Sequence, residues 1–120
     1  MKGDRLGMAA QRNDVRQVTR LIKKGVSVNV KNGVSGVTPL GVASERGHVE
    51  MVKLLLESKA RVMDATNDGL NSLHIATQFG QAAVTRLLTS EEQLAREPEL
   101  DLNLPGGLVL LGLDRATSAS

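Results

Sequence analysis

The chain of 120 residues has no cysteine and one aromatic residue, Phe79. Without thiols it can form no disulfide, no thiolate nucleophile and no cysteine-based metal site. A single aromatic residue argues against modules that stack nucleic-acid bases on aromatic side chains, so we expect no direct nucleic-acid partner. No apolar run reaches membrane-spanning length, and none follows the first residues as in a signal peptide. We therefore expect one domain, located in the cytosol or nucleus.

Charge is distributed unevenly along the chain. The net charge is +2, but residues 1–90 carry 13 Lys or Arg against 7 Asp or Glu, a charge of +6. Residues 91–120 carry 2 against 6, a charge of −4. The simplest interpretation is a solvated basic surface followed by a soluble acidic tail. Two alternatives stay open: the basic surface meets an acidic partner, or the tail folds back onto it.

A short helix, a tight turn and a longer helix are predicted for residues 38–56. Thr38 is suited to cap a helix N-terminus, and Pro39 is suited to the first helical position. Gly47 ends this helix after about two turns. Beyond it, apolar residues recur at helical spacing, with charged residues between them. These apolar residues are Val49, Val52, Leu55 and Leu56.

This pattern recurs along the chain at a spacing of 33 or 34 residues. Residues 71–76 lie 33 positions after residues 38–43, and residues 6–10 lie 34 positions before residues 40–44. The glycine turn at Gly47 recurs at Gly80. The pattern resembles the ankyrin repeat, whose signature T-P-L-H-x-A is followed by a glycine turn and a V-x-x-L-L run. Gly41 stands where that family usually has histidine.

The resemblance implies an all-α fold, a right-handed α-solenoid of paired antiparallel helices joined by short β-hairpin loops. We expect a repeat domain over residues 1–90, with about three repeats near 4–31, 33–65 and 66–92, and an irregular acidic Leu/Gly-rich tail over 91–120. No fourth repeat can be found. The expected helices lie near 5–12, 15–24, 39–45, 49–58, 72–78 and 82–89.

Several positions carry local conformational signals. Asp4 is suited to cap a first helix beginning at Arg5. Asn13 occupies the position of Gly47, and asparagine tolerates a left-handed conformation. Lys59 occupies the position of Gly25, so we expect a left-handed lysine and a weaker helix end there. Hairpin tips are predicted around Asn32-Gly33 and Asn67-Asp68-Gly69.

Neither histidine indicates catalysis. His74 and His48 lie in different repeats, and no nucleophile pattern accompanies them. In the ankyrin family, the histidine that matches His74 bonds local backbone and hydroxyl groups. The acidic residues near Asp68 lack the order of a calcium loop, and Gly33-x-x-Gly36 lacks the Lys-Ser/Thr of a phosphate loop. We therefore expect no enzyme activity, no metal and no cofactor.

The C-terminal tail is less regular. Ser90 followed by Gln93 is typical of a capping box that starts a short helix over residues 91–96, and Pro98 would end it. The alternation of leucines over residues 100–105 predicts an extended segment. The third repeat leaves an apolar strip at the end of the stack, and three alternatives stay open for it. The tail covers this strip, a partner covers it, or the chain is a shortened form of a longer array.

The tail also contains a candidate motif. Leu100, Leu102 and Leu104 alternate as in the plant amphiphilic repression motif, L-x-L-x-L, whose leucines enter a groove on a corepressor. Alternating leucines on an extended backbone suit that mode of recognition. A transcriptional repression adaptor is therefore an alternative function.

The ankyrin resemblance implies that the chain is a scaffold or adaptor that binds a protein partner through a concave surface of hairpin tips and inner-helix residues. The partner's identity is not encoded in the sequence. We expect a monomer, with self-association through the open C-terminal end as an alternative. The candidate partner-binding residues are Gln11, Arg12, Lys31, Val34, Ser35, Val37, Glu45, Arg46, Asn67, Asp68, Leu70, Gln78 and Phe79.

Phe79 has two interpretations. Its equivalents in the other two repeats are Arg12 and Arg46, so the position is expected to be at least partly exposed to solvent. An exposed aromatic residue is a good binding anchor because it offers a large apolar area with little rotamer entropy to lose. Alternatively, Phe79 packs beneath the leucine-rich tail and helps to close the end of the stack.

Overall fold

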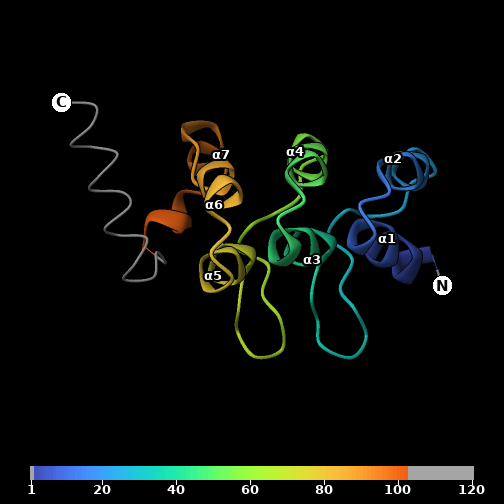
Figure 1. The fold of residues 1–120 in the computed structure, drawn as a ribbon, viewed down its shortest axis with the longest axis horizontal. Coiled ribbons are helices and arrows are strands. Elements are labelled where there is room, and N and C mark those ends of the chain that lie inside the picture. The colour runs from blue at the N-terminus through green and yellow to red at the C-terminus, as the bar shows by residue number, and fades with distance from the viewer. Residues whose placement is uncertain (1, 103–120) are drawn as a thin grey trace.

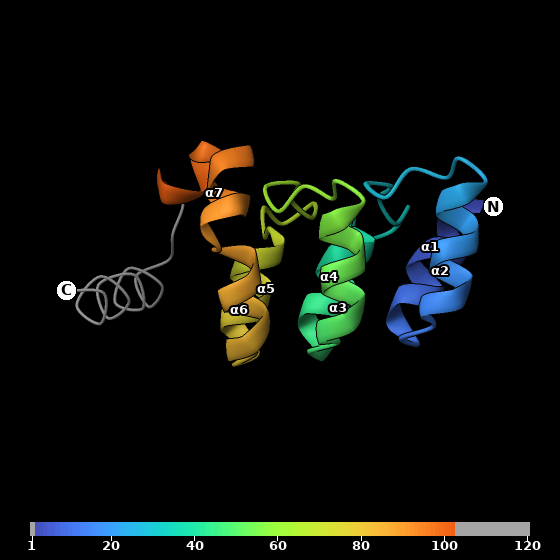
Figure 2. The same cartoon turned by 90° about the horizontal axis from the view of Figure 1, so that it is seen from above.

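The computed structural model describes residues 2–102 of the chain, in which three helix pairs stack side by side (Figures 1 and 2). The pairs are α1 (Lys2–Gln11) with α2 (Val15–Lys23), α3 (Pro39–Arg46) with α4 (Val49–Glu57), and α5 (Ser72–Gln78) with α6 (Ala82–Leu88). Each helix lies within two or three residues of its predicted range. A seventh helix, α7 (Glu91–Arg96), and a 3-10 helix, η1 (Pro98–Leu102), follow.

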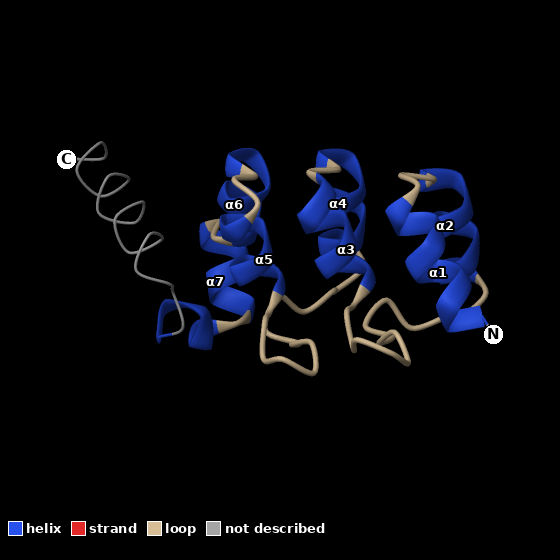
Figure 3. Cartoon of the chain, turned by 60° about the horizontal axis from the view of Figure 1, so that its bottom comes forward, coloured by secondary structure: helices blue, strands red, loops and turns tan. Residues whose placement is uncertain are grey.

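The helices form two layers. Helices α1, α3 and α5 lie side by side in the inner layer, and α2, α4 and α6 form the outer layer (Figure 1). Two long loops project from the inner layer on the same side: the first finger (residues 24–38) and the second finger (residues 58–71). The predicted hairpins are closed by bonds from Asn32 N–H to Val37 C=O and from Thr66 N–H to Leu70 C=O, but no β-strand occurs within residues 2–102 (Figure 3).

Capping side chains start the inner helices α3 and α5. The Thr38 hydroxyl accepts from the Gly41 N–H at 3.1 Å, and Pro39 is the first residue of α3. The Asn71 side chain accepts from the His74 N–H at 2.9 Å, and His74 Nδ1 accepts from the Asn71 N–H at 3.1 Å, which completes a capping box. The predicted cap at Asp4 is wrong, because α1 begins at Lys2 and includes Asp4 in its first turn.

Left-handed residues occur where the repeat register predicts them. Asn13 has φ 60°, at the position of Gly47, which has φ 71°. Lys59 has φ 74°, at the position of Gly25, which has φ 93°. Both predictions from the sequence are confirmed, and equivalent turns therefore keep the same conformation when another residue replaces glycine.

Equivalent residues of the three repeats form one continuous core strip. Leu6, Leu40 and Leu73 occupy one register position, and each is fully buried. Ala9, Ala43 and Ala76 are also buried one turn further along, where their small side chains let the inner helices approach closely. Because each repeat packs only on its neighbours, this strip has two ends that need a cover.

Residues 90–102 cover the C-terminal end of the strip. The Ser90 hydroxyl accepts from the Gln93 N–H at 3.2 Å, so the predicted short helix and the Ser90 half of its capping box are confirmed, whereas the Gln93 side chain donates to Glu97. Leu100 is fully buried and belongs to the core cluster. The predicted extended conformation of this segment is wrong as far as Leu102, because η1 is helical and brings Leu100 back onto the stack.

Candidate partner-binding surface

Most exposed large apolar side chains belong to the fingers and to the inner layer of helices. Among the residues whose exposure is described, five large hydrophobic side chains are exposed. Four of them belong to the fingers or to the inner helices and their C-terminal ends: Met8 (50%), Val34 (88%), Leu70 (37%) and Phe79 (52%). We call the exposed residues of these elements the finger face. The fifth, Val15, begins the outer helix α2.

Most residues predicted to bind a partner are exposed on the finger face. Val37 and Glu45 are half-buried, and the other eleven are exposed. Phe79 is the C-terminal cap of α5 and is half exposed, which agrees with the exposure inferred from Arg12 and Arg46. The exposed predicted residues are Gln11, Arg12, Lys31, Val34, Ser35, Arg46, Asn67, Asp68, Leu70, Gln78 and Phe79.

Two of the predicted residues hold the fingers together. Asn67 donates from its backbone N–H to the Ser35 carbonyl at 2.8 Å and from its Nδ2 to the Val34 carbonyl at 3.0 Å. Lys31 Nζ donates to the Ala65 carbonyl at 3.0 Å. These bonds join the first finger to the second, so both side chains have a structural role that positions Val34 and Ser35.

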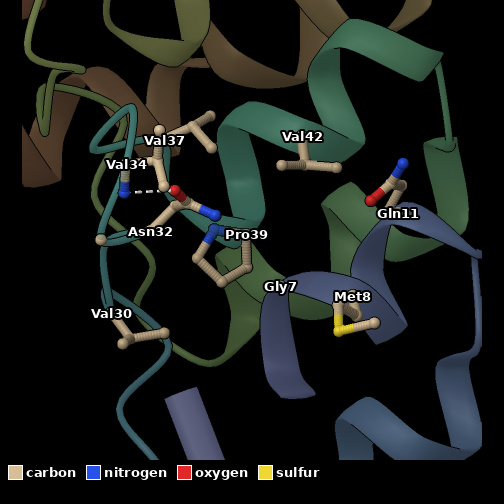
Figure 4. A pocket seen from close by; sticks show the side chains of 10 residues that line it. Gly7, Met8, Gln11, Val30, Asn32, Val34, Val37, Pro39 and Val42 are labelled. Carbon is tan, nitrogen blue, oxygen red and sulfur yellow. Dashed lines mark hydrogen bonds between the residues drawn. The ribbon is translucent and has the colours of Figure 1, made fainter. Parts of the chain in front are cut away.

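An apolar groove lies between α1, the first finger and α3, with a volume of about 360 Å³ (Figure 4). This volume lies at the lower end of the range for ligand clefts. The Asn32 carboxamide accepts from the Val34 N–H at 2.7 Å and so fixes the finger wall. The groove is lined by Gly7, Met8, Gln11, Val30, Asn32, Gly33, Val34, Val37, Pro39 and Val42.

Sequence reasoning missed two residues of this groove that a repeat signal identifies. Met8 and Val42 occupy the same register position, the x of T-P-L-H-x-A, and lie on the wall made by the inner helices. Their equivalent in the third repeat, Ile75, is buried. The sequence does carry a signal for this position, because it lies one helical turn before Arg12 and Arg46, which were predicted to bind a partner.

The two histidines make structural bonds. His74 belongs to the capping box of α5. His48 Nε2 lies 3.1 Å from the Gln11 carbonyl oxygen and donates to it, because a carbonyl can only accept. Gln81 makes the corresponding bond in the next repeat, from Nε2 to the Glu45 carbonyl at 2.8 Å. Each bond ties an outer helix to the inner helix of the preceding repeat.

Within the described part of the chain, no group of His, Cys, Asp or Glu side chains is placed to hold a metal ion. Nor is any helix of residues 2–102 both long and apolar enough to cross a membrane.

The predicted repression motif is not presented as an exposed extended segment. Leu100, its first leucine, is fully buried in the 3-10 helix η1. Leu102 is the last residue of η1, and Leu104 lies outside the described residues. A buried leucine cannot enter a groove on another protein unless the end of the stack opens, so the structure gives this motif no support.

Stacked helix pairs, paired fingers on one side and turns that repeat in register define a helical repeat protein. A model of ankyrin repeats in three copies matches residues 6–98, and the chain belongs to the ankyrin repeat family. Repeats of this family are, as a class, protein–protein interaction modules.

Two of the proteins to which the chain is similar are named for their ankyrin repeats. Ankyrin repeat domain-containing protein 40 of Mus musculus is 44% identical over 102 residues, and that of Homo sapiens is 33% identical over 102 residues. These matches include 81% and 85% of this chain but 28% and 27% of those proteins. The probable E3 ubiquitin-protein ligase XBOS33 of Oryza sativa subsp. japonica is 37% identical over 87 residues, which include 72% of this chain and 16% of the ligase.

Proposed function

We propose that the chain is a non-catalytic interaction module that binds a protein partner on its finger face. The observation that carries this proposal is the distribution of exposed apolar side chains. Four of the five large ones belong to the finger face, among the residues whose exposure is described. Exposed apolar residues that share one surface are typical of a protein interaction site, and these four share the finger face.

The rigidity of the finger face also supports the proposal. The bonds of Asn67 and Lys31 hold the two fingers in a fixed arrangement. The inner helices are held by bonds from His48 and Gln81 in the following repeats. A preorganised surface loses little conformational entropy on binding, so most of the contact energy contributes to affinity.

The proposal is tested by capturing proteins on the immobilised chain and on matched variants of it. The immobilised chain is compared with Val34→Asp, Phe79→Ala and the control Val15→Asp, which alters the exposed apolar residue outside the finger face. Aspartate is tolerated at Val15 because it lies in the first turn of α2. We expect the same bound proteins with the original chain and the control, and their loss with one or both finger-face variants.

Two results would count against the proposal. One is retention of every captured protein by both finger-face variants. The other is loss of the captured proteins with Val15→Asp while that variant keeps the helical circular dichroism and unfolding midpoint of the original chain. Circular dichroism of all four proteins separates lost binding from lost structure.

A further inference from the structure

The groove between α1 and the first finger owes its shape to two glycines. Gly7 lines it, and a Cβ built on Gly7 meets nothing within 4 Å. Gly41 occupies the equivalent position of the second repeat, and a Cβ there would approach the Val37 methyl group to 2.8 Å. Val37 can therefore lie back against α3 and leave the groove open. The third repeat has His74 at this position.

Two arginines lie close in sequence to residues that line the groove. Arg12 follows Met8 by one helical turn, and its N–H donates to the Met8 carbonyl at 3.1 Å. Arg46 follows Val42 by one turn in α3. Helices α1 and α3 pack side by side, and residues four apart share a helix face, so each arginine lies on the same face of its helix as a groove residue.

These arginines are available for a ligand. Both are exposed, and neither takes part in an ion pair among the described residues. The acidic residues nearest to them in sequence are Asp14, whose carboxylate caps α2 by accepting from the Gln17 N–H at 3.1 Å, and Glu45, which is half-buried. Neither arginine therefore has a carboxylate partner among the described residues, and a carboxylate is the group that guanidinium forks bind best.

We propose that this groove binds a short segment of a partner protein in which a bulky apolar side chain is flanked by acidic residues. The apolar side chain enters between Met8, Val37 and Val42, and the carboxylates meet Arg12 and Arg46. The inference rests on the proposed function and adds the chemistry of the partner. The chain's own acidic tail is the less favoured occupant, because η1 ends at the opposite end of the stack from α1 (Figure 2).

A library of random short peptides displayed on phage tests this inference with the full chain as bait. We expect the enriched peptides to combine a Leu, Ile, Met or Phe with neighbouring Asp or Glu residues. Arg12→Glu combined with Arg46→Glu should weaken the binding of these peptides about tenfold or more and remove most of its salt dependence. Gly7→Phe should have a similar effect on affinity, because its ring has room to fill the groove.

The matched control is Arg20→Glu combined with Lys23→Glu on the outer helix α2, which changes the charge equally away from the groove. Enriched peptides that are neutral or basic, or that bind both groove variants as well as the original chain, would overturn the inference. If such peptides still lose binding with Phe79→Ala, the proposed function survives. If no peptide is enriched, or none responds to any finger-face variant, both proposals fail.

Discussion

The residue that follows an outer helix carries backbone strain in one repeat and not in another. Lys59 and Gly25 both have a positive φ, but only glycine adopts it without a steric penalty from Cβ. We expect Lys59→Gly to stabilise the fold by about 1 kcal/mol. The measurement is the urea unfolding midpoint followed by circular dichroism at 222 nm, the standard band for helix loss.

The reciprocal substitution is the control for Lys59. Gly25→Lys places a side chain in the same conformation, and a Cβ at Gly25 meets nothing within 4 Å, so only backbone strain changes. It should destabilise the fold by about 1 kcal/mol. Equal midpoints for the two variants and the original chain would show that the left-handed conformation of this turn has no cost.

Replacing two other glycines with alanine should change the stability of the fold in opposite directions. Gly7 lies within α1 with open space around it, so Gly7→Ala should stabilise the fold by about 0.5–1 kcal/mol through helix propensity. Gly36 has φ 78°, and a Cβ there would lie 2.6 Å from Asn67 Oδ1. Gly36→Ala should therefore destabilise the fold and separate the fingers. Thermal unfolding of both variants checks this, and a shift of the same sign in both would contradict it.

At the scale of elements, α7 is attached to the stack by Arg96, whose Nη1 donates to the Leu56 carbonyl at 3.0 Å, and by the carboxylate of Glu97, which follows the helix. Glu97 is buried and accepts from the Val62 N–H at 2.8 Å and the Met63 N–H at 2.9 Å, with Gln93 Nε2 as a third donor. Bonds to a charged acceptor are stronger than neutral ones. Glu97→Gln should cost about 2 kcal/mol, because the amide group presents an N–H to at least one of these donors.

Hydrogen exchange of the Val62 and Met63 amides measures this attachment directly, alongside the urea midpoint. Glu92→Gln is the matched control, since it removes the exposed ion pair with Arg96 from the same helix. That change should cost no more than about 0.5 kcal/mol. If Glu97→Gln leaves both amides as well protected as Glu92→Gln does, the bond network does not hold the end of the stack.

These elements show where sequence reasoning succeeded and where it stopped. The cap at Ser90 depends on residues three apart, so a local pattern predicts it. The hydrogen bonds that Glu97 accepts join residues 34 and 35 positions apart, and no local pattern encodes them. The prediction of an extended tail from alternating leucines failed because it also used only a local pattern. Periodicity does not take into account that Leu100 is buried against the end of the core.

At the scale of the whole molecule, the repeat register predicted more than the local patterns did. It placed Asn13 and Lys59 in left-handed conformations and most predicted binding residues on the surface. The register did not predict the groove, because a cavity depends on which side chains are missing where two repeats meet. Gly41 was noted only as a departure from a family pattern, and Gly7 led to no prediction, although the room they leave shapes the surface.

The last prediction concerns how far unfolding spreads through the stack. Leu40 and Leu6 share a register position, and both are fully buried. Leu40 lies in α3, which packs against both α1 and α5, whereas Leu6 lies in α1, at the end of the inner layer. Truncating either leucine to alanine should cost about 3 kcal/mol locally. Leu40→Ala should lower the stability of every helix together, because both interfaces of the central repeat weaken.

Leu6→Ala should instead loosen mainly the first repeat, with the other two still packed on each other. Urea titrations followed by circular dichroism and by amide signals from α1 and α5 distinguish these outcomes. We expect coincident transitions for Leu40→Ala and an earlier loss of the α1 signals for Leu6→Ala. Coincident transitions in both variants would mean that three repeats unfold as one unit, with coupling between neighbours larger than the loss of one buried leucine.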